Sequence, residues 1–412
     1  MSSEIAPLRG MKDLLPKEYR VAKYIEDVAL KTSQLYGFEG FSTPILESAS
    51  VFDRTLGDTS DVVSKEMYCF PDKKGRLIAL RPEFTASVMR AVISNGLKHK
   101  LPLKLFSSGP LFRYDRPQEG RQRQFHQINI EHIGAKGPFS DAEIIKLAVH
   151  ILSALGLKDD VDLELTSLGC AESRADYQKV LIEYFKKYEP DLSADSRARL
   201  HQNPLRILDS KDEKDKEIVK NAPVITGYYT KEAAEYFKQV ISYLDMFGVK
   251  YVLNPKLARG LDYYSHTTFE FTTKKLGAQS TVLAGGRYDG LSALMGEDVI
   301  PSIGFAAGIE RLALLGAYNV ERERPNYIFP MGQDAIAASI KLADDLRQNN
   351  IQVLVESDGK VAKRIQQAVS AKAKYAIFIG GDEIASGMYK LKNLDTGEEK
   401  SFSPSEIKEQ LR

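Results

Sequence analysis

Apolar and polar residues in the first quarter of the chain change from helical to strand-like spacing. Across residues 16–36 apolar side chains recur on one helical face, and Gly37 follows them, which predicts a first helix that ends at the glycine. The segment GFEGFSTPILES predicts a turn and a strand that Pro44 interrupts. Residues 77–80 predict a further strand, and Pro82 suits the first position of the helix expected after it.

Two strand-like runs, 103–106 and 125–130, flank a polar segment and predict a long hairpin. Polar residues at every second position of the second run share one face of the sheet. This row forms the floor of a pocket or faces water, and the periodicity does not choose between them. The row consists of Gln127, Asn129 and Glu131, which we expect to alternate with Phe125, Ile128 and Ile130.

The middle of the chain combines another helix, a charged stretch and two more strands. A capping-box pattern from Ser140 to Glu143 predicts the start of a helix. Residues 171–222 are charge-dense and helix-like, so we interpret them as an inserted helical module. Residues 266–273 predict a strand with residues 279–284 as its hairpin partner. A helix is expected from about Gly304 to Leu315.

Beyond Pro325, strand and helix patterns alternate to the end of the chain, which predicts a small, separate α/β domain. The segment ERERPN is the expected linker. We therefore place one domain at residues 1–324, with the helical insertion inside it, and a second at residues 325–412. A chain of 412 residues has room for this arrangement, at about 150 residues per domain or lobe.

Composition narrows the class of protein. The 57 Lys and Arg residues balance 56 Asp and Glu residues, which argues against a generic nucleic-acid binder but permits a local basic groove. Cys69 and Cys170 have no CxxC spacing, and the six histidines form no cluster, so we expect no disulfide framework and no metal site built from these residues. The N-terminus has no signal-peptide pattern and no apolar run suits a membrane helix, which favours a cytoplasmic protein.

Arginines are the candidates for phosphate binding, because the sequence contains neither GxxxxGK[ST] nor GxGxxG. Guanidinium groups bind phosphate with two parallel hydrogen bonds. Charge alone favours the alternative of a solvated basic loop that pairs with Asp115 and Glu119. The densest group lies at the tip of the predicted hairpin and consists of Arg113, Arg116, Arg121 and Arg123.

Three further positions suit a polar pocket. Glu83 is expected in the first turn of its helix, where the helix dipole favours an acid or where a cationic ligand group binds. Tyr264 lies in LARGLDYYSH and Tyr288 in AGGRYDGL. Because a buried tyrosine hydroxyl requires a polar partner, these rings either complete a core or line a polar pocket.

Two glycines and an arginine share one face of the helix expected at 304–315. Gly304 and Gly308 would leave that face shallow. Either a flat ligand or a packed strand would fill the space. Arg311 beside it would stack on a base or contact phosphate, or it would remain a surface residue; the spacing does not decide.

Taken together, these segments resemble the histidyl branch of the class II aminoacyl-tRNA synthetases. PLRGMKDLLP is similar to the opening of the family, GFEGFSTPILE to motif 1, FRYDRPQEGRQRQFHQ to motif 2 and GFAAGIERL to motif 3. RGLDYY and GGRYDGL resemble the two signatures of the histidyl branch. The motifs occur in the family's order along nearly the whole chain.

The resemblance implies an α+β catalytic domain with an antiparallel sheet flanked by helices, a helical insertion, and a C-terminal α/β anticodon-binding domain. It also implies a two-step reaction. L-Histidine and ATP, with Mg²⁺, give histidyl-adenylate and pyrophosphate, and histidine then passes to the 3′ end of tRNA(His). It further implies a homodimer with Pro44 at the interface.

The resemblance also implies a role for each candidate residue. Arg113 and Arg259 are the expected catalytic residues, because both would hold the α-phosphate during adenylation. Gly304, Gly308 and Arg311 complete the expected ATP site. Asp115 stands where the motif usually has Glu. The expected histidine pocket consists of Glu83, Thr85, Gln127, Glu131, Tyr264 and Tyr288, and the expected tRNA acceptor loop of Arg116, Gln118, Arg121 and Arg123.

Three alternatives share parts of this pattern. One is a non-catalytic, synthetase-like regulatory subunit of the first enzyme of histidine biosynthesis. It is disfavoured because this chain keeps the arginines and has a C-terminal α/β segment. The second is a tRNA-sensing module of a kinase, but no kinase segment is present. The third is a class II synthetase for another amino acid, against which RGLDYY and GGRYDGL argue by resemblance.

Overall fold

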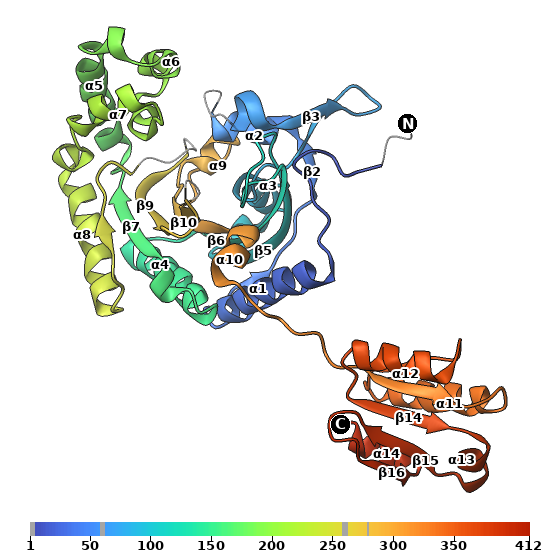
Figure 1. Cartoon of the computed structure of the whole chain (residues 1–412). Coiled ribbons are helices and arrows are strands. Elements are labelled where there is room, and N and C mark those ends of the chain that lie inside the picture. The colour runs from blue at the N-terminus through green and yellow to red at the C-terminus, as the bar shows by residue number, and fades with distance from the viewer. Residues whose placement is uncertain (1–4, 58–61, 258–262, 278–279) are drawn as a thin grey trace. The chain divides into compact units, whose positions relative to one another are not determined.

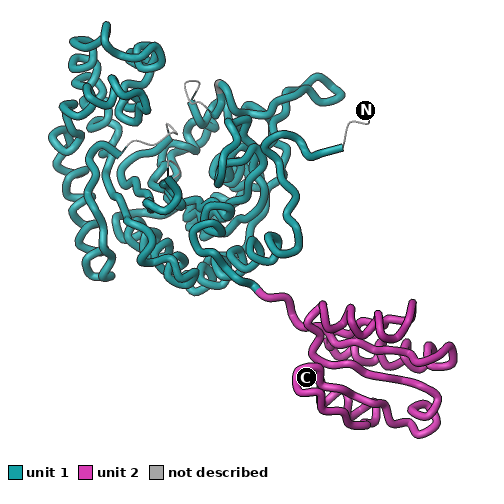
Figure 2. The backbone as a smooth tube through the Cα atoms, in the orientation of Figure 1, with its two compact units in different colours: residues 1–320 teal, residues 321–412 magenta. Residues whose placement is uncertain are grey.

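The structure, a computed structural model, describes residues 5–57, 62–257, 263–277 and 280–412. The chain divides into two compact units, residues 1–320 and residues 321–412 (Figure 2). Each unit has its own sheet and its own hydrophobic clusters. Within the described ranges, every helix is too short or too polar to span a bilayer.

Unit 1 is built on an eight-stranded sheet (Figure 1). The inner strands pair antiparallel, and only the outermost strand at each edge pairs parallel. This confirms the predicted sheet. In spatial order the strands are β1 (Glu39–Gly40), β5 (Leu103–Phe112), β6 (Gln124–Ile133), β11 (Ser302–Gly308), β10 (Thr281–Arg287), β9 (Ser265–Thr272), β7 (Asp162–Ser167) and β8 (Val252–Leu253).

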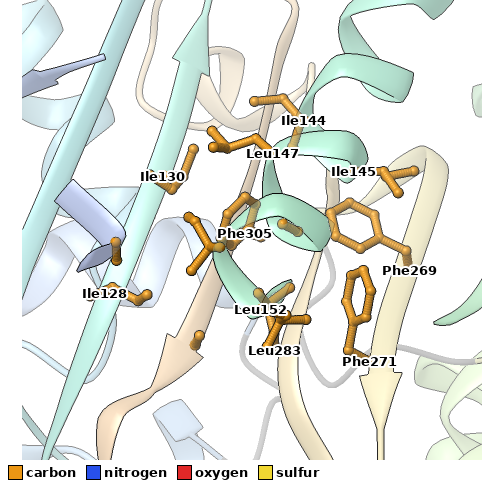
Figure 3. Packing of buried hydrophobic residues seen from close by; sticks show 14 of the residues in the cluster. Ile128, Ile130, Ile144, Ile145, Leu147, Leu152, Phe269, Phe271, Leu283 and Phe305 are labelled. Carbon is orange, nitrogen blue, oxygen red and sulfur yellow. The ribbon is translucent and has the colours of Figure 1, made fainter. Parts of the chain in front are cut away.

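Four helices cover one face of this sheet and bury its central part. Figure 3 shows Phe269, Phe271 and Phe305 of the strands packed against the apolar side of α4. All three rings are buried, so this face supplies stability and leaves no room for a ligand. The covering helices are α1 (Pro16–Gln34), α4 (Pro138–Ala154), α8 (Lys231–Met246) and α10 (Ile309–Gly316).

The opposite face is covered less completely, and the candidate site lies there. Three short helices pack on it, namely α2 (Ala49–Leu56), α3 (Thr85–Ser94) and α9 (Leu291–Leu294). A small sheet lies beside them, formed by β2 (Leu46–Ser48), β4 (Leu77–Leu80) and β3 (Tyr68–Pro71). The hydrophobic cluster on this face includes the rings of Tyr263, Tyr264 and Tyr288.

The insertion forms a helical module with its own hydrophobic cluster. Its helices are α5 (Ala171–Lys186), α6 (Ala194–Gln202) and α7 (Glu213–Lys220). Asp215 of α7 is buried and accepts hydrogen bonds from the hydroxyls of Ser193, Ser196 and Ser210. These bonds join α6 and the turn at Ser210 to α7 through one carboxylate.

Unit 2 has a five-stranded mixed sheet, as the alternating pattern predicts. Its spatial order is β13 (Val353–Val355), β12 (Asn326–Pro330), β14 (Tyr375–Ile379), β15 (Tyr389–Asn393) and β16 (Glu399–Phe402). The helices are α11 (Ala335–Gln348), α12 (Val361–Ser370), α13 (Gly381–Ser386) and α14 (Pro404–Gln410).

Three predictions of where a helix begins are wrong. Residues 302–308 form strand β11, and α10 begins only at Ile309, so Gly304, Gly308 and Arg311 do not share a helix face. A short apolar run fits both periods, and sheet pairing selected the strand. Helix α3 begins at Thr85, so Pro82 is not its first residue and Glu83 does not lie in its first turn, because both precede it. Helix α4 begins at Pro138, and Ser140 does not cap it, because its hydroxyl donates to the carbonyl of Lys136.

Candidate active site

A cleft opens on the α3 face of the large sheet, above the middle strands. Its lining comes from the N-terminus of α3, the tip of the β5–β6 hairpin and the central strands. It brings together ten of the predicted site residues: Glu83, Thr85, Arg113, Arg121, Gln127, Tyr264, Tyr288, Gly304, Gly308 and Arg311.

The row of polar residues on β6 forms the floor of this cleft. Gln127 and Asn129 line it, and Glu131 lies buried at its inner end. Ile128 and Ile130 point to the opposite, dry face. Phe125 shares the polar face and also lines the cleft, so its predicted alternation with that row was wrong by one position.

Glu131 is the centre of a buried hydrogen-bond network. Its carboxylate accepts from the Thr85 hydroxyl at 2.5 Å, from the Asn129 amide at 2.9 Å and from the Tyr288 hydroxyl. Burial raises the pKa of Glu131 to about 7, although these hydrogen bonds favour the ionised form. The network fixes the carboxylate in one position, and burial brings its pKa close to neutral pH.

Gly304 explains how this carboxylate fits between two strands. It lies directly opposite Glu131 in the β6–β11 pair. A Cβ atom on Gly304 would lie 2.0 Å from Glu131 Oε2 and 2.3 Å from the Ile130 carbonyl oxygen. Only glycine leaves room for the carboxylate at this position.

Glu83 holds a second buried carboxylate in the cleft. It precedes α3 and accepts hydrogen bonds from the backbone N–H groups of Thr85 at 2.6 Å and Ala86 at 2.8 Å. Burial raises the pKa of Glu83, while these two donors and the charge of Arg113 act in the other direction. The side chain therefore has a fixed orientation at the N-terminus of the helix.

Arginines gather where β6 begins, away from Glu131. The Arg113 Nε donates to the Pro82 carbonyl at 2.9 Å, and its guanidinium lies 5.4 Å from the centre of the Phe125 ring. Arg311 Nε donates to the Gly120 carbonyl at 3.1 Å. Burial and the charges of Arg121 and Arg113 lower the pKa of Arg311. Such mutual repulsion is relieved by an anion, so this end of the cleft suits phosphate groups.

The chain also matches known proteins over its whole length. A family model described as histidyl-tRNA synthetase matches residues 10–312, and a model described as an anticodon binding domain matches residues 326–412. The chain belongs to the histidyl-tRNA synthetase family. The resemblance stated from the motifs is therefore confirmed.

Individual relatives of the synthetase agree with this assignment. The histidine–tRNA ligase of Rickettsia bellii is 58% identical over 400 residues, which are 97% of this chain and 96% of the relative. That of Rickettsia felis is 55% identical over 413 residues and covers all of both chains. The crystal structure of apo histidyl-tRNA synthetase from S. aureus has a TM-score of 0.84, with 33% identity over 99% of each chain. The predicted fold and enzyme class, a histidine–tRNA ligase, are confirmed.

Four predicted residues of the synthetase, three on the hairpin and one before β2, lie outside the cleft lining. Arg116 and Gln118 are exposed at the hairpin tip. The Arg123 guanidinium lies 3.6 Å from the centre of the Tyr114 ring. Pro44 is exposed just before β2. Arg259 lies outside the described residues.

Several cleft residues of the synthetase had not been proposed from the sequence. Glu270 lines the cleft, and its Oε2 accepts a hydrogen bond from the Thr281 hydroxyl at 2.8 Å. Its alternation with Phe269 and Phe271, which face the core, was the available signal. Glu310 lines the cleft beside Arg311 and accepts from the backbone N–H of His126, a contact between distant segments that the sequence does not reveal.

Proposed function

We propose that this one cleft catalyses both steps of histidine–tRNA ligation. Histidine and ATP react there to give histidyl-adenylate and pyrophosphate, and histidine then passes to the 3′ end of tRNA(His). The observation that carries the proposal is the arrangement along β6. A buried, hydrogen-bonded carboxylate lies at one end of the cleft, and a cluster of arginines lies at the other.

The Glu131 end is the proposed histidine pocket. The imidazole would bind to Glu131, Tyr264 and Tyr288. The hydrogen bonds that hold the Glu131 carboxylate fix its position, so it would accept a hydrogen bond only from a side chain whose N–H reaches it, as that of imidazole would. Glu83 and Thr85 would receive the substrate ammonium group. Gln127 lines the same cleft, between this pocket and the arginines.

The arginine end is the proposed ATP site. Arg113 would hold the α-phosphate and Arg311 the γ-phosphate, and Arg259 would stabilise charge at the reacting phosphorus from the other side. Adenylation needs positioned reactants and charge stabilisation more than an acid–base pair. Gly308 would leave room for the nucleotide next to Arg311. Gly304 was expected in the ATP site, but the atom closest to its Cβ position is Glu131 Oε2, which belongs to the proposed histidine pocket.

Mg²⁺ fits the acidic residues of the cleft. Glu66 and Glu270 line it and offer carboxylate oxygens, the ligands that Mg²⁺ prefers. Among the described residues no three His, Cys, Asp or Glu side chains gather into a metal site. Mg²⁺ commonly keeps water and substrate phosphates as its other ligands. When bound, it would neutralise charge on the β- and γ-phosphates, and Glu270 is the residue that we propose would help to hold it.

The remaining surfaces would bind tRNA and a second copy of the chain. The hairpin tip, with Arg116, Gln118, Arg121 and Arg123, would meet the acceptor end, and unit 2 would bind the anticodon. The region around Pro44 carries exposed apolar residues, including Leu46 and Leu77, which supports a homodimer there. Sedimentation analysis would test the dimer. We place the reaction in the cytoplasm, where tRNA is charged.

The experiment that tests this function is ATP–pyrophosphate exchange with each of the twenty amino acids in turn. Exchange with histidine alone, dependent on Mg²⁺, supports the proposal, and tRNA charging then tests the second step. Exchange with a different amino acid would overturn the pocket assignment. No exchange from folded protein would favour the regulatory subunit.

A further inference from the structure

The insertion module is attached to the rest of unit 1 beside the candidate histidine pocket. The chain enters the module after β7, through Leu168 and Gly169. Here the Leu168 N–H donates to the His266 carbonyl at 2.6 Å, and the His266 N–H donates to the Gly169 carbonyl at 2.9 Å. The entrance of the module is thus hydrogen-bonded to the start of β9, two residues beyond Tyr264.

One side chain of the module reaches further, to Tyr264 itself. Arg174 lies in the first turn of α5 and is half-buried. Its Nη1 donates to the backbone carbonyl of Tyr264 at 2.5 Å. A charged donor on a carbonyl is among the stronger hydrogen bonds in proteins, so this contact restrains the backbone of a residue whose side chain lines the cleft.

Tyr264 passes this restraint to the rest of the pocket through packed rings. It is buried, and its ring centre lies 4.8 Å from that of Tyr263. The Tyr263 ring lies 5.8 Å from the ring of Tyr288, whose hydroxyl donates to Glu131. Because buried rings in contact cannot move independently, a shift of the Tyr264 backbone would reach Glu131.

The module also contacts the chain that leads toward this region from the other side. Lys256 follows β8, and its Nζ donates to the carbonyls of Val219 at 3.0 Å and Lys220 at 2.5 Å, at the end of α7. A cation is favoured at the C-terminus of a helix. The module is therefore hydrogen-bonded both to Lys256, which precedes Tyr264 in the chain, and to Tyr264 itself.

We propose that Arg174 is a positioning residue for histidine binding, through which the insertion module fixes Tyr264 and the aromatic wall of the amino-acid pocket. The inference rests on the proposed function, because it assigns Tyr264 to that pocket. Arg174 does not line the cleft, so its proposed effect on the affinity for histidine is indirect and runs through its hydrogen bond to Tyr264.

The test compares Arg174→Ala with a matched control, Arg197→Ala. Arg197 belongs to the same module and also donates to a carbonyl, that of Leu192 at 2.9 Å, but this partner lies inside the module. In ATP–pyrophosphate exchange we expect Arg174→Ala to raise the KM for histidine about tenfold. The KM for ATP should change less than twofold, and Arg174→Lys should restore part of the affinity. The control should match the wild type.

Three outcomes separate this inference from the proposed function. If Arg174→Ala resembles the control, or raises both KM values equally, Arg174 does not position the pocket. Tyr264→Phe tests the pocket itself. An unchanged KM for histidine in that variant overturns the assignment of Tyr264, whereas a raised KM beside an unchanged Arg174→Ala overturns only the inference. If Arg174→Ala does not fold, Arg174→Lys and Lys256→Met replace it in the comparison of KM values with Arg197→Ala.

Discussion

Gly304 and Glu131 face each other across β6 and β11, and the missing side chain of Gly304 is the space that the Glu131 carboxylate occupies. Gly304→Ala would place a methyl group 2.3 Å from the Ile130 carbonyl as well, so neither the backbone nor the carboxylate can stay in place. We expect the variant to lose histidine-dependent exchange by about 100-fold or more, because misplacement by about 1 Å has an effect of this size.

Gly290→Ala is the matched control for this substitution. Gly290 has a φ of −78°, and its added Cβ would meet nothing within 4 Å. It should retain normal exchange and normal thermal stability. Full activity of Gly304→Ala would show that the strand pair tolerates a methyl group and that the pocket does not depend on this contact.

The pKa of Glu131, raised by burial to about 7, predicts how histidine binding depends on pH. The carboxyl is largely protonated below this value and ionised above it, and the ionised form accepts the imidazole N–H more strongly. The KM for histidine should therefore fall as the pH rises from about 6 to 8.

Glu131→Gln should remove this pH step and raise the KM for histidine at pH 8 about tenfold to 100-fold, because a neutral amide replaces the carboxylate. Histidine itself titrates near this range. The effect of Glu131 is therefore the difference between the variant and the wild type in how the KM for histidine changes with pH. Parallel pH profiles of the two proteins would contradict a role for Glu131 ionisation.

The sequence predicted much of this fold because several elements have one clear period. The strand at residues 77–80 has the predicted bounds, and the alternation of Phe269 and Phe271 correctly indicated a strand with its apolar face inward. The helix predicted from Gly304 was wrong because the residues between Ser302 and Gly308 are all apolar, and no polar residue there marks the period. The requirement for glycine at position 304 follows only from the pairing of β6 with β11, which places Glu131 opposite it.

The candidate site was less accessible to sequence analysis, since its residues come from strands far apart in the chain. The motifs indicated Arg113 and Arg311, but charge alone could not distinguish them from solvated surface residues. The contact between Glu310 and His126, and that between Arg174 and Tyr264, depend on how separate elements pack. No local pattern encodes such contacts.

The insertion module should be sensitive to acid because of Asp215. Burial alone would raise the pKa of Asp215, but hydrogen bonds from Ser196, Ser210 and Ser193 outweigh it and lower the pKa. The contribution of this carboxylate to stability is thus complete above its ordinary pKa, near 3.8, and is lost as the pH falls further.

Asp215→Ala should destabilise the module by about 2–3 kcal/mol at pH 7, since it removes the acceptor of the buried Ser196 hydroxyl and of the half-buried Ser193 and Ser210 hydroxyls. Limited proteolysis of the full chain should then cut first within residues 171–222. Asp212→Ala, which removes only an exposed cap of α7, is the milder comparison. Equal protection of both variants would mean that the serine hydroxyls find other partners.

Arg259 can be tested by chemistry although it lies outside the described residues. If it stabilises charge on the α-phosphorus, Arg259→Ala should slow pyrophosphate exchange by about 100- to 1,000-fold, the usual effect of removing such a donor. Thermal melting should not change. Near-normal exchange would leave Arg113 as the only arginine assigned to the α-phosphate.

Deletion of residues 321–412 should separate the two half-reactions. The cleft and the clusters that support it belong to unit 1, whereas unit 2 has hydrophobic clusters of its own. The truncated protein should therefore keep histidine-dependent pyrophosphate exchange within a few-fold of the full chain. Its charging of tRNA should fall far more, since the proposed anticodon contacts are gone and phosphate contacts supply much of the affinity for nucleic acid. If a truncated protein with a normal melting curve lost both activities equally, unit 2 would be needed for adenylation, and its role could not be confined to tRNA.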